Sequence, residues 1–200
     1  MEERKIGQIK DELKAATEAM LPSFIASYEP DERSGVKKLV EQAKKRLQKL
    51  EEERKRIWNL QEYERKYSEY AYICGIDEVG RGPLAGPVVA GAVILPKDCD
   101  ILYINDSKKL TAAKREELYD EIMEKAVATG IGMVSPQRID EINILQATYE
   151  AMREAISKLN PSPDILLNDA VTIPEVTIPQ QKWKRQSKKS KVLTTQVSVS

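Results

Sequence analysis

Two adjacent carboxylates, Asp77 and Glu78, stand at the end of an apolar stretch of this sequence. The preceding residues 72–76 are rich in aromatic and β-branched side chains, which indicates a buried strand. Two ionised carboxylates side by side are unfavourable there, because desolvation and like-charge repulsion both oppose ionisation unless a cation compensates them. Since hard divalent ions prefer oxygen ligands, the pair is a candidate metal site.

Glycines follow the acids at positions 80, 82 and 86, and Arg81 lies between the first two. Glycine in or after a strand usually marks positive φ or the close approach of another molecule's backbone. An arginine between such glycines suits a phosphodiester partner. Taken alone, however, this short motif is more often a tight turn with exposed acids and a solvated arginine.

Three motifs favour a functional site over an ordinary turn: GIDEVGRGPLAGPVVA at residues 75–90, NDSKKL at 105–110 and IDEIN at 139–143. In order and spacing they resemble bacterial ribonuclease HII, and the resemblance extends over residues 72–181. It implies an α/β, ribonuclease H-like fold with a mixed sheet flanked by helices. It also implies an endonuclease that hydrolyses the RNA strand of RNA–DNA hybrids, or cuts at ribonucleotides embedded in duplex DNA, as ribonucleotide excision repair requires.

The resemblance implies a catalytic site of three acids, Asp77, Glu78 and Asp169, which would hold two divalent ions, Mg²⁺ or Mn²⁺. Successive strand residues face opposite sides, so Asp77 and Glu78 can share one metal cluster only if the chain bends or a main-chain oxygen takes part. Without the family, Asp169 would be read as an ordinary turn aspartate at a strand end. Asn168 departs from the family pattern, which usually has an apolar residue there.

The resemblance also implies a set of substrate contacts. The segment of Gly80, Arg81 and Gly82 would meet the 2′-hydroxyl of a ribonucleotide that lies next to deoxyribonucleotides. That hydroxyl is both a donor and an acceptor, and it separates RNA from DNA. Ser107 and Lys108, in a loop before a helix start, suit a phosphate contact.

Composition limits which catalytic groups are possible and indicates the cellular compartment. The 200 residues carry 32 basic and 32 acidic side chains and no histidine, which excludes Ser-His and Cys-His nucleophiles and histidine general bases. Cys74 and Cys99 lack zinc-site spacing, and Cys74 is expected to be a buried, reduced thiol in a strand. The charged N-terminus is no signal peptide, and no run reaches transmembrane length, so a cytoplasmic protein without a membrane partner is predicted.

Residues 1–70 are predicted to form an α-helical hairpin or short coiled coil. Apolar residues recur at steps of three and four from Ile6 to Met20, where Pro22 is expected to end the helix, and again from Val36. These 70 residues hold 16 basic and 15 acidic side chains, so residues 44–56 are interpreted as a salt-bridged helix face. Nucleic-acid binding by this face is the less favoured alternative.

Alternating strands and helices are predicted for a catalytic domain at residues 71–181. Strands are expected at 72–76, 87–96, 101–105, 130–134 and 163–170, with the first two antiparallel. Helices are expected to begin at Thr111 and at Asp140. Such an order builds a mixed sheet flanked by helices, with acids at strand ends.

Residues 182–200 are predicted to be a basic, disordered tail, with six basic side chains and no acid. At this place the family pattern has a further strand, a helix with a fourth metal-binding aspartate, and a C-terminal helical segment. We therefore expect a catalytic domain that is incomplete at its C-terminus and impaired in cleavage. The alternatives are a catalytically inactive nucleic-acid-binding module and a non-functional fragment.

Overall fold

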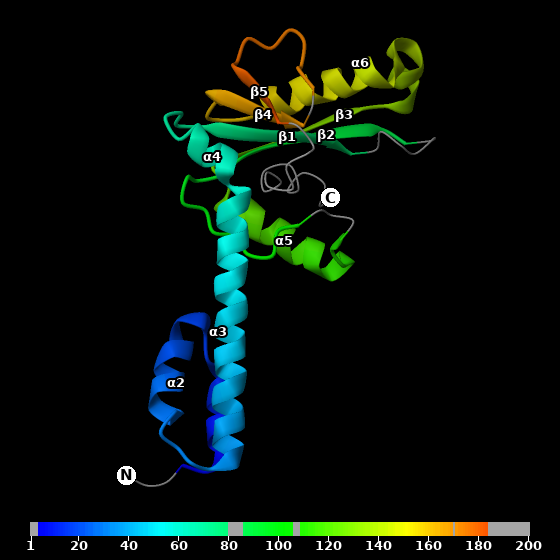
Figure 1. Ribbon diagram of the computed structural model, residues 1–200. Helices are drawn as coiled ribbons and strands as arrows, with labels where there is room; N and C mark the ends of the chain where they lie inside the picture. The colour runs from blue at the N-terminus through cyan, green and yellow to red at the C-terminus, as the bar shows by residue number, and fades with distance from the viewer. Residues whose placement is uncertain (1–3, 80–85, 106–108, 170, 184–200) are drawn as a thin grey trace. The chain divides into compact units, whose positions relative to one another are not determined.

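The computed structural model describes residues 4–79, 86–105, 109–169 and 171–183 (Figure 1). The chain divides into two compact units, residues 1–56 and 57–200. Helix α3 (Ser34–Leu60) continues from the first unit into the second, so the helical segment predicted for residues 1–70 contributes to both. No helix within the described ranges is long and apolar enough to cross a membrane.

The first unit is helical, as predicted, but its first arm is broken. It contains α1 (Ile6–Ala15), a 3₁₀ turn η1 (Glu18–Met20) and α2 (Leu21–Tyr28), before α3 begins. Ala16 is extended, with ψ 125°, and ends α1. The prediction that Pro22 closes a helix is wrong: Pro22 lies in the first turn of α2, where its missing N–H has no intrahelical partner to lose.

The second unit is built on a five-stranded mixed sheet in the order β3-β2-β1-β4-β5. Its strands are β1 (Ile73–Val79), β2 (Val88–Ile94), β3 (Ala128–Val134), β4 (Ile165–Asp169) and β5 (Gln180–Trp183). The pairs β1–β2 and β2–β3 are antiparallel, whereas β1–β4 and β4–β5 are parallel. The predicted mixed sheet and the antiparallel first pair are confirmed.

One predicted strand is absent, and one strand was not predicted. Residues 101–105 contain no strand, because Ile101 and Ile104 are only 1% exposed and pack into an apolar cluster rather than into the sheet. Strand β5 was not predicted, and it carries regular structure through Lys182 to Trp183, into the segment expected to be a disordered tail.

Three helices flank this sheet: the short α4 (Glu62–Lys66), α5 (Ala112–Lys125) and α6 (Pro136–Ser157). The predicted N-cap of α5 is confirmed, since Lys114 N donates to Thr111 Oγ1 at 3.2 Å. The start predicted for α6 at Asp140 is wrong. That helix begins four residues earlier, at Pro136, with Ser135 as its N-cap.

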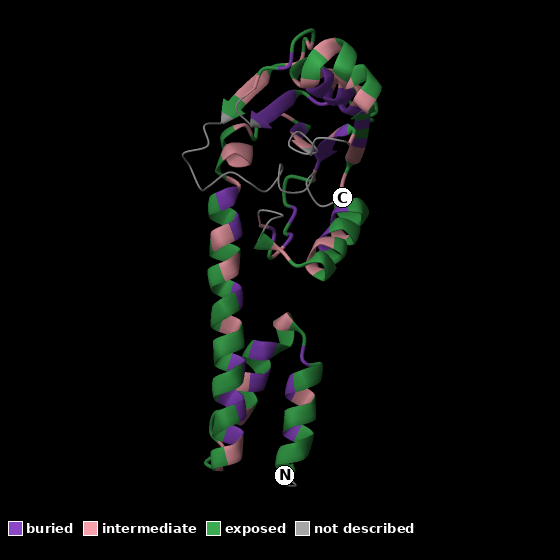
Figure 2. Cartoon of the chain, turned by 90° about the vertical axis from the view of Figure 1, so that its right-hand side faces the viewer, coloured by how far each residue is buried: buried purple, intermediate pink, exposed green. Residues whose placement is uncertain are grey.

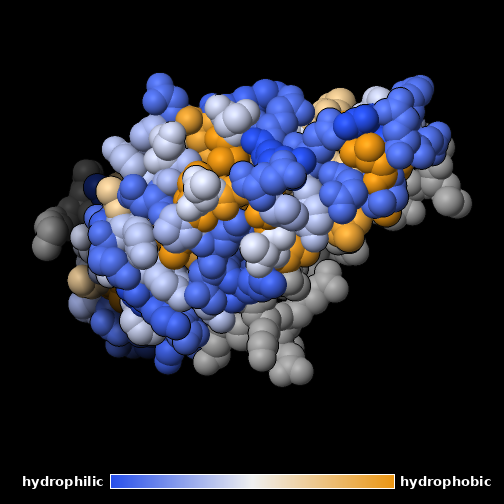
Figure 3. All heavy atoms as spheres, turned by 90° about the horizontal axis from the view of Figure 1, so that it is seen from above, coloured by the Kyte–Doolittle hydropathy of each residue, from blue (hydrophilic) through white to orange (hydrophobic). Residues whose placement is uncertain are grey.

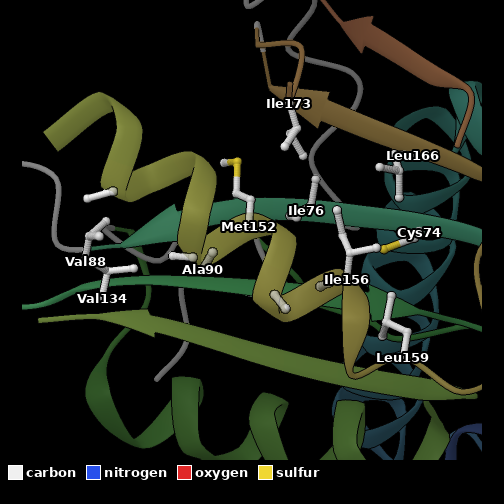
Figure 4. Close-up of a cluster of buried hydrophobic side chains, with 14 of the residues drawn as sticks. Cys74, Ile76, Val88, Ala90, Val134, Met152, Ile156, Leu159, Leu166 and Ile173 are labelled. Atoms are coloured by element: carbon white, nitrogen blue, oxygen red, sulfur yellow. The ribbon is translucent and has the colours of Figure 1, made fainter. Parts of the chain in front are cut away.

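Helix α6 covers one face of the sheet. Ala147, Ala151 and Ala155 share one side of the helix and are completely buried, so the helix axis can approach the strands closely. Met152 and Ile156 fill the remaining space against Cys74 and Ile76 of β1 (Figure 4). The molecular face that carries α6 is mainly hydrophilic, with small apolar areas between the charged side chains (Figure 3).

The opposite face packs against two smaller apolar clusters. In one, Ile57 and Leu60 of α3 meet Val93, Cys99 and Leu118. In the other, Ile73, Ile165 and Leu167 lie under Tyr63, Tyr67 and Tyr70. Cys74 is buried as predicted, and burial raises the pKa of its thiol to about 12, which keeps the thiol protonated.

Helix α4 buries one carboxylate, that of Glu64, whose burial is only partly compensated by the charge of Arg65. Neither side-chain oxygen of Glu64 has a hydrogen-bond partner among the described residues. The nearby cations form their direct contacts elsewhere: Arg65 stacks on Trp58 and donates to its carbonyl, and Lys97 Nζ donates to Ser68 O at 2.7 Å. Burial consequently raises the pKa of Glu64 from 4.5 to about 7.

Replacing Glu64 by Gln is expected to change how stability depends on pH. Between pH 4.5 and 7 the folded chain retains the Glu64 proton that the unfolded chain has lost, so the unfolding free energy falls as pH rises. Glu64→Gln removes this fall and should be about 1–2 kcal/mol more stable at pH 8, less than the full shift because the amide is also buried. Urea unfolding at pH 4.5 and pH 8 measures the difference.

The matched control is Glu62→Gln, an exposed acid on the same helix, which should leave the pH profile of stability unchanged. A Glu64→Gln profile parallel to that of the original chain would contradict the raised pKa.

Candidate active site

Strand pairing brings the backbones of two predicted acids together. In the parallel pair β1–β4, Ile76 is the register partner of Asn168. Asp77 follows Ile76 and Asp169 follows Asn168, so the two acids occupy successive positions at the same end of neighbouring strands. Because the carboxyl ends of parallel strands meet at one sheet edge, residues far apart in sequence share one location.

Asp77 and Glu78 are both half-buried and lie in regular strand, opposite Gly91 and Ala90 of β2. Ile76 belongs to the cluster beneath α6, so strand alternation places Glu78 on that face and Asp77 on the other. Within the described part of β1 the chain does not bend before Val79. Asp77 and Glu78 can therefore share one metal cluster only if the chain bends beyond this strand or if main-chain oxygens take part.

A backbone hydrogen bond orients the first acid. Glu78 N donates to Asp77 Oδ1 at 2.9 Å, which fixes that carboxylate relative to the strand. Gly91, the register partner of Asp77, has no side chain and so leaves space across the strand pair. Sequence reasoning missed this glycine, although an isolated glycine inside an apolar strand is a signal of close approach.

The donor chemistry fits a divalent ion. All three predicted ligands are carboxylates, and oxygen donors suit Mg²⁺ and Mn²⁺ better than they suit softer metals. Among the side chains that the structure describes, no group of three His, Cys, Asp or Glu could hold a metal. The side chain of Asp169 lies outside that set, so the three-acid site stays a prediction, and backbone register relates only Asp77 and Asp169.

Asn168, which departs from the family pattern, has a structural role. It is completely buried, and its Nδ2 donates to Gln180 Oε1 at 2.8 Å. Gln180 also accepts from Ile173 N at 2.8 Å and donates to Ile173 O at 2.9 Å. This network ties the start of β5 and the loop after β4 to the end of β4, where Asp169 stands. In the sequence, the signal for this structural role was the presence of a polar residue in an otherwise apolar strand.

The predicted substrate contacts cannot be placed by strand register as the acids were. They lie outside the described residues and stay predictions: Gly80, Arg81, Gly82, Ser107 and Lys108.

A family model decides the relationship. The model of ribonuclease HII matches residues 74–200, which is more than half of the sequence. The chain belongs to the ribonuclease HII family. A second model, the ribonuclease HII N-terminal domain, matches residues 5–68 and covers most of the helical leader. Membership of this ribonuclease HII family confirms the prediction of a ribonuclease H-type hydrolase.

Curated ribonucleases HII are similar over most of the chain. That of Lachnoclostridium phytofermentans is 64% identical over 176 residues, which are 88% of this chain and 69% of the relative. That of Ligilactobacillus salivarius is 47% identical over 182 residues, or 90% of this chain and 70% of the relative. For Bacillus cytotoxicus the values are 52% over 152 residues, 75% of this chain but 58% of the relative.

A solved structure shares the fold of this chain. The ribonuclease H2 of Pyrococcus horikoshii superimposes with a TM-score of 0.52 at 23% identity, over 64% of this chain and 69% of that one. The ribonuclease H-like fold implied by the motifs is thereby confirmed.

Proposed function

We propose that this chain is an endonuclease that hydrolyses the RNA strand of RNA–DNA hybrids, or cuts at ribonucleotides embedded in duplex DNA. Two divalent ions, Mg²⁺ or Mn²⁺, would be held by Asp77, Glu78 and Asp169. The segment of Gly80, Arg81 and Gly82 would contact the ribose 2′-hydroxyl, and Ser107 and Lys108 would contact phosphate.

The observation that carries this proposal is the register of β1 and β4, which sets Asp77 and Asp169 at neighbouring positions in a ribonuclease HII family member. A metal site needs ligands whose positions are fixed before the ion binds. Strand β1 meets this need because it is paired with β4 up to Ile76, directly before Asp77, and with β2 up to Val79.

Bound divalent ions activate a water, neutralise the phosphate and stabilise the leaving oxygen in phosphodiester hydrolysis. The residues of this chain supply the negative charge and the orientation that such ions need. The hydrogen bond from Glu78 N holds one oxygen of Asp77 in a set direction, which reduces the reorganisation needed when a ligand binds.

Cleavage of a labelled DNA duplex with one embedded ribonucleotide, and of an RNA–DNA hybrid, tests the proposal with Mg²⁺ and with Mn²⁺. We expect metal-dependent cuts at ribonucleotides and none in an all-DNA duplex. Duplex binding without cleavage would identify an inactive nucleic-acid-binding module instead. Loss of a cooperative thermal transition would identify a non-functional fragment.

A further inference from the structure

One side of helix α3 carries a row of exposed lysines. Lys38, Lys45 and Lys49, with Gln42 between the first two, recur at steps of four, three and four residues. That spacing places the four side chains on a single face of the helix. At 1.5 Å per residue, the row of three lysines, here called the basic stripe, extends over about 16 Å.

Several other basic residues of the same helix are paired with acids of the first unit. Lys37 pairs with Glu32 at 2.5 Å and Lys44 with Glu29 at 2.8 Å. Arg54 lies 3.6 Å from Glu18. None of the stripe lysines forms an ion pair with any residue that the structure describes, and the same holds for Arg46 and Lys55 of this helix.

Glu41 stands one helical turn from both Lys38 and Lys45, but no acid of α3 forms an ion pair with the stripe. Glu41 lies 3.8 Å from Lys44, and Gln48 donates to Glu52 at 2.9 Å. Glu53 forms a close ion pair with Arg56. The remaining acid, Glu51, follows Lys49 by two residues, so it points about 200° away around the helix.

The stripe also faces away from the packing surface of the unit. Val36, Val40, Ala43 and Leu50 of α3 are buried, on the side that meets the shorter helices (Figure 2). These apolar residues are therefore already packed inside the unit, and the outer side of α3 presents only polar and charged groups. An interfacial membrane helix would instead need an exposed apolar face next to its basic residues.

We propose that the basic stripe of α3 binds the phosphate backbone of a nucleic-acid duplex. A linear row of uncompensated ammonium groups on a rigid helix complements a linear row of phosphates, and each contact releases condensed counterions. The identity of the duplex as substrate rests on the proposed function, whereas the phosphate contact does not. Because phosphates are common to all duplexes, the stripe adds affinity and leaves the choice of ribonucleotide to the sheet edge.

The test measures binding of the full chain to a fluorescent RNA–DNA hybrid and to an all-DNA duplex, by anisotropy, in EDTA over a range of salt. Replacing Lys38, Lys45 and Lys49 by Gln should weaken binding to both duplexes about tenfold at low salt. The slope of log affinity against log salt should become shallower by about 2–3, since each phosphate contact contributes about 0.9. Helicity and melting temperature should stay unchanged, because the three side chains are exposed.

The matched control removes the same charge from the same helix at paired positions, by Gln at Lys37, Lys44 and Arg54. It should change affinity less than twofold. Replacing the three stripe lysines by Arg keeps the positive charge and should retain binding. This variant distinguishes an effect of charge from a loss of the folded structure. Equal losses in both Gln triples, or no loss, would overturn the proposal.

Two further outcomes separate the partners and the proposals. Binding to phosphatidylglycerol vesicles that needs the stripe, without duplex binding, would replace the nucleic acid by a membrane and overturn the inference. Stripe-dependent duplex binding by a chain that cleaves nothing would support the inference and refute the proposed function. Cleavage together with duplex binding that does not depend on the stripe would support the proposed function and overturn the inference.

Discussion

Asp77→Asn is expected to lower the rate of metal-dependent cleavage of a ribonucleotide-containing duplex by about 1,000-fold or more. The substitution keeps the shape of the side chain and removes the charge that a divalent ion needs, while transition-state stabilisation by a single group is commonly worth two to three orders of magnitude. Asp77 also belongs to the central strand of the sheet, and its carboxylate is oriented by Glu78 N.

Two measurements test the Asp77 prediction. Calorimetric titration with Mn²⁺ should show clearly weaker binding to Asp77→Asn, and single-turnover cleavage should show the loss of rate. Glu116→Gln, an exposed acid on α5, serves as the control and should match the original chain in both. Unchanged Mn²⁺ affinity in Asp77→Asn would remove the proposed metal site, whatever happened to the rate.

Gly132→Ala is expected to destabilise the second unit by about 3–5 kcal/mol, because overpacking against the backbone cannot be relieved by a rotamer change. A Cβ at this position would lie 1.9 Å from Ala151 O and 2.8 Å from Ala155 N of α6. Strand β3 and helix α6 would have to separate, and the cluster beneath α6 would lose its packing with them.

Urea unfolding followed by fluorescence measures this cost. Gly7→Ala is the matched control, since a Cβ there meets nothing within 4 Å and alanine favours the helix that contains it. A Gly132→Ala chain within about 1 kcal/mol of the original would show that β3 and α6 are less tightly packed than their backbones indicate.

The local features of this protein follow from its sequence, because they depend on neighbouring residues. The apolar run before Asp77 forms β1, and its pairing with β2 follows from the tendency of strands that are consecutive in sequence to pair. The hydroxyl of Thr111 caps α5 as its residue type predicts. The motifs around Asp77, read together, were sufficient for the family and the fold.

The tertiary structure decided which segments meet. Apolar residues at 101–105 suit a strand equally well, yet Ile101 and Ile104 are used to fill a cluster, and only the surrounding elements determine that choice. The break between α1 and α2 likewise falls at the extended Ala16 and not at Pro22, which lies in the first turn of α2.

Strand order is the decisive case for function. The sequence by itself supplied three acids at strand ends, but not the insertion of β1 between β2 and β4 that sets Asp77 beside Asp169. Nor did it supply the partner of Asn168, since Gln180 reaches it only after β5 pairs with β4. Residue type determines which chemistry is possible, while long-range pairing determines which residues share a site, because pairing depends on burial summed over the whole domain.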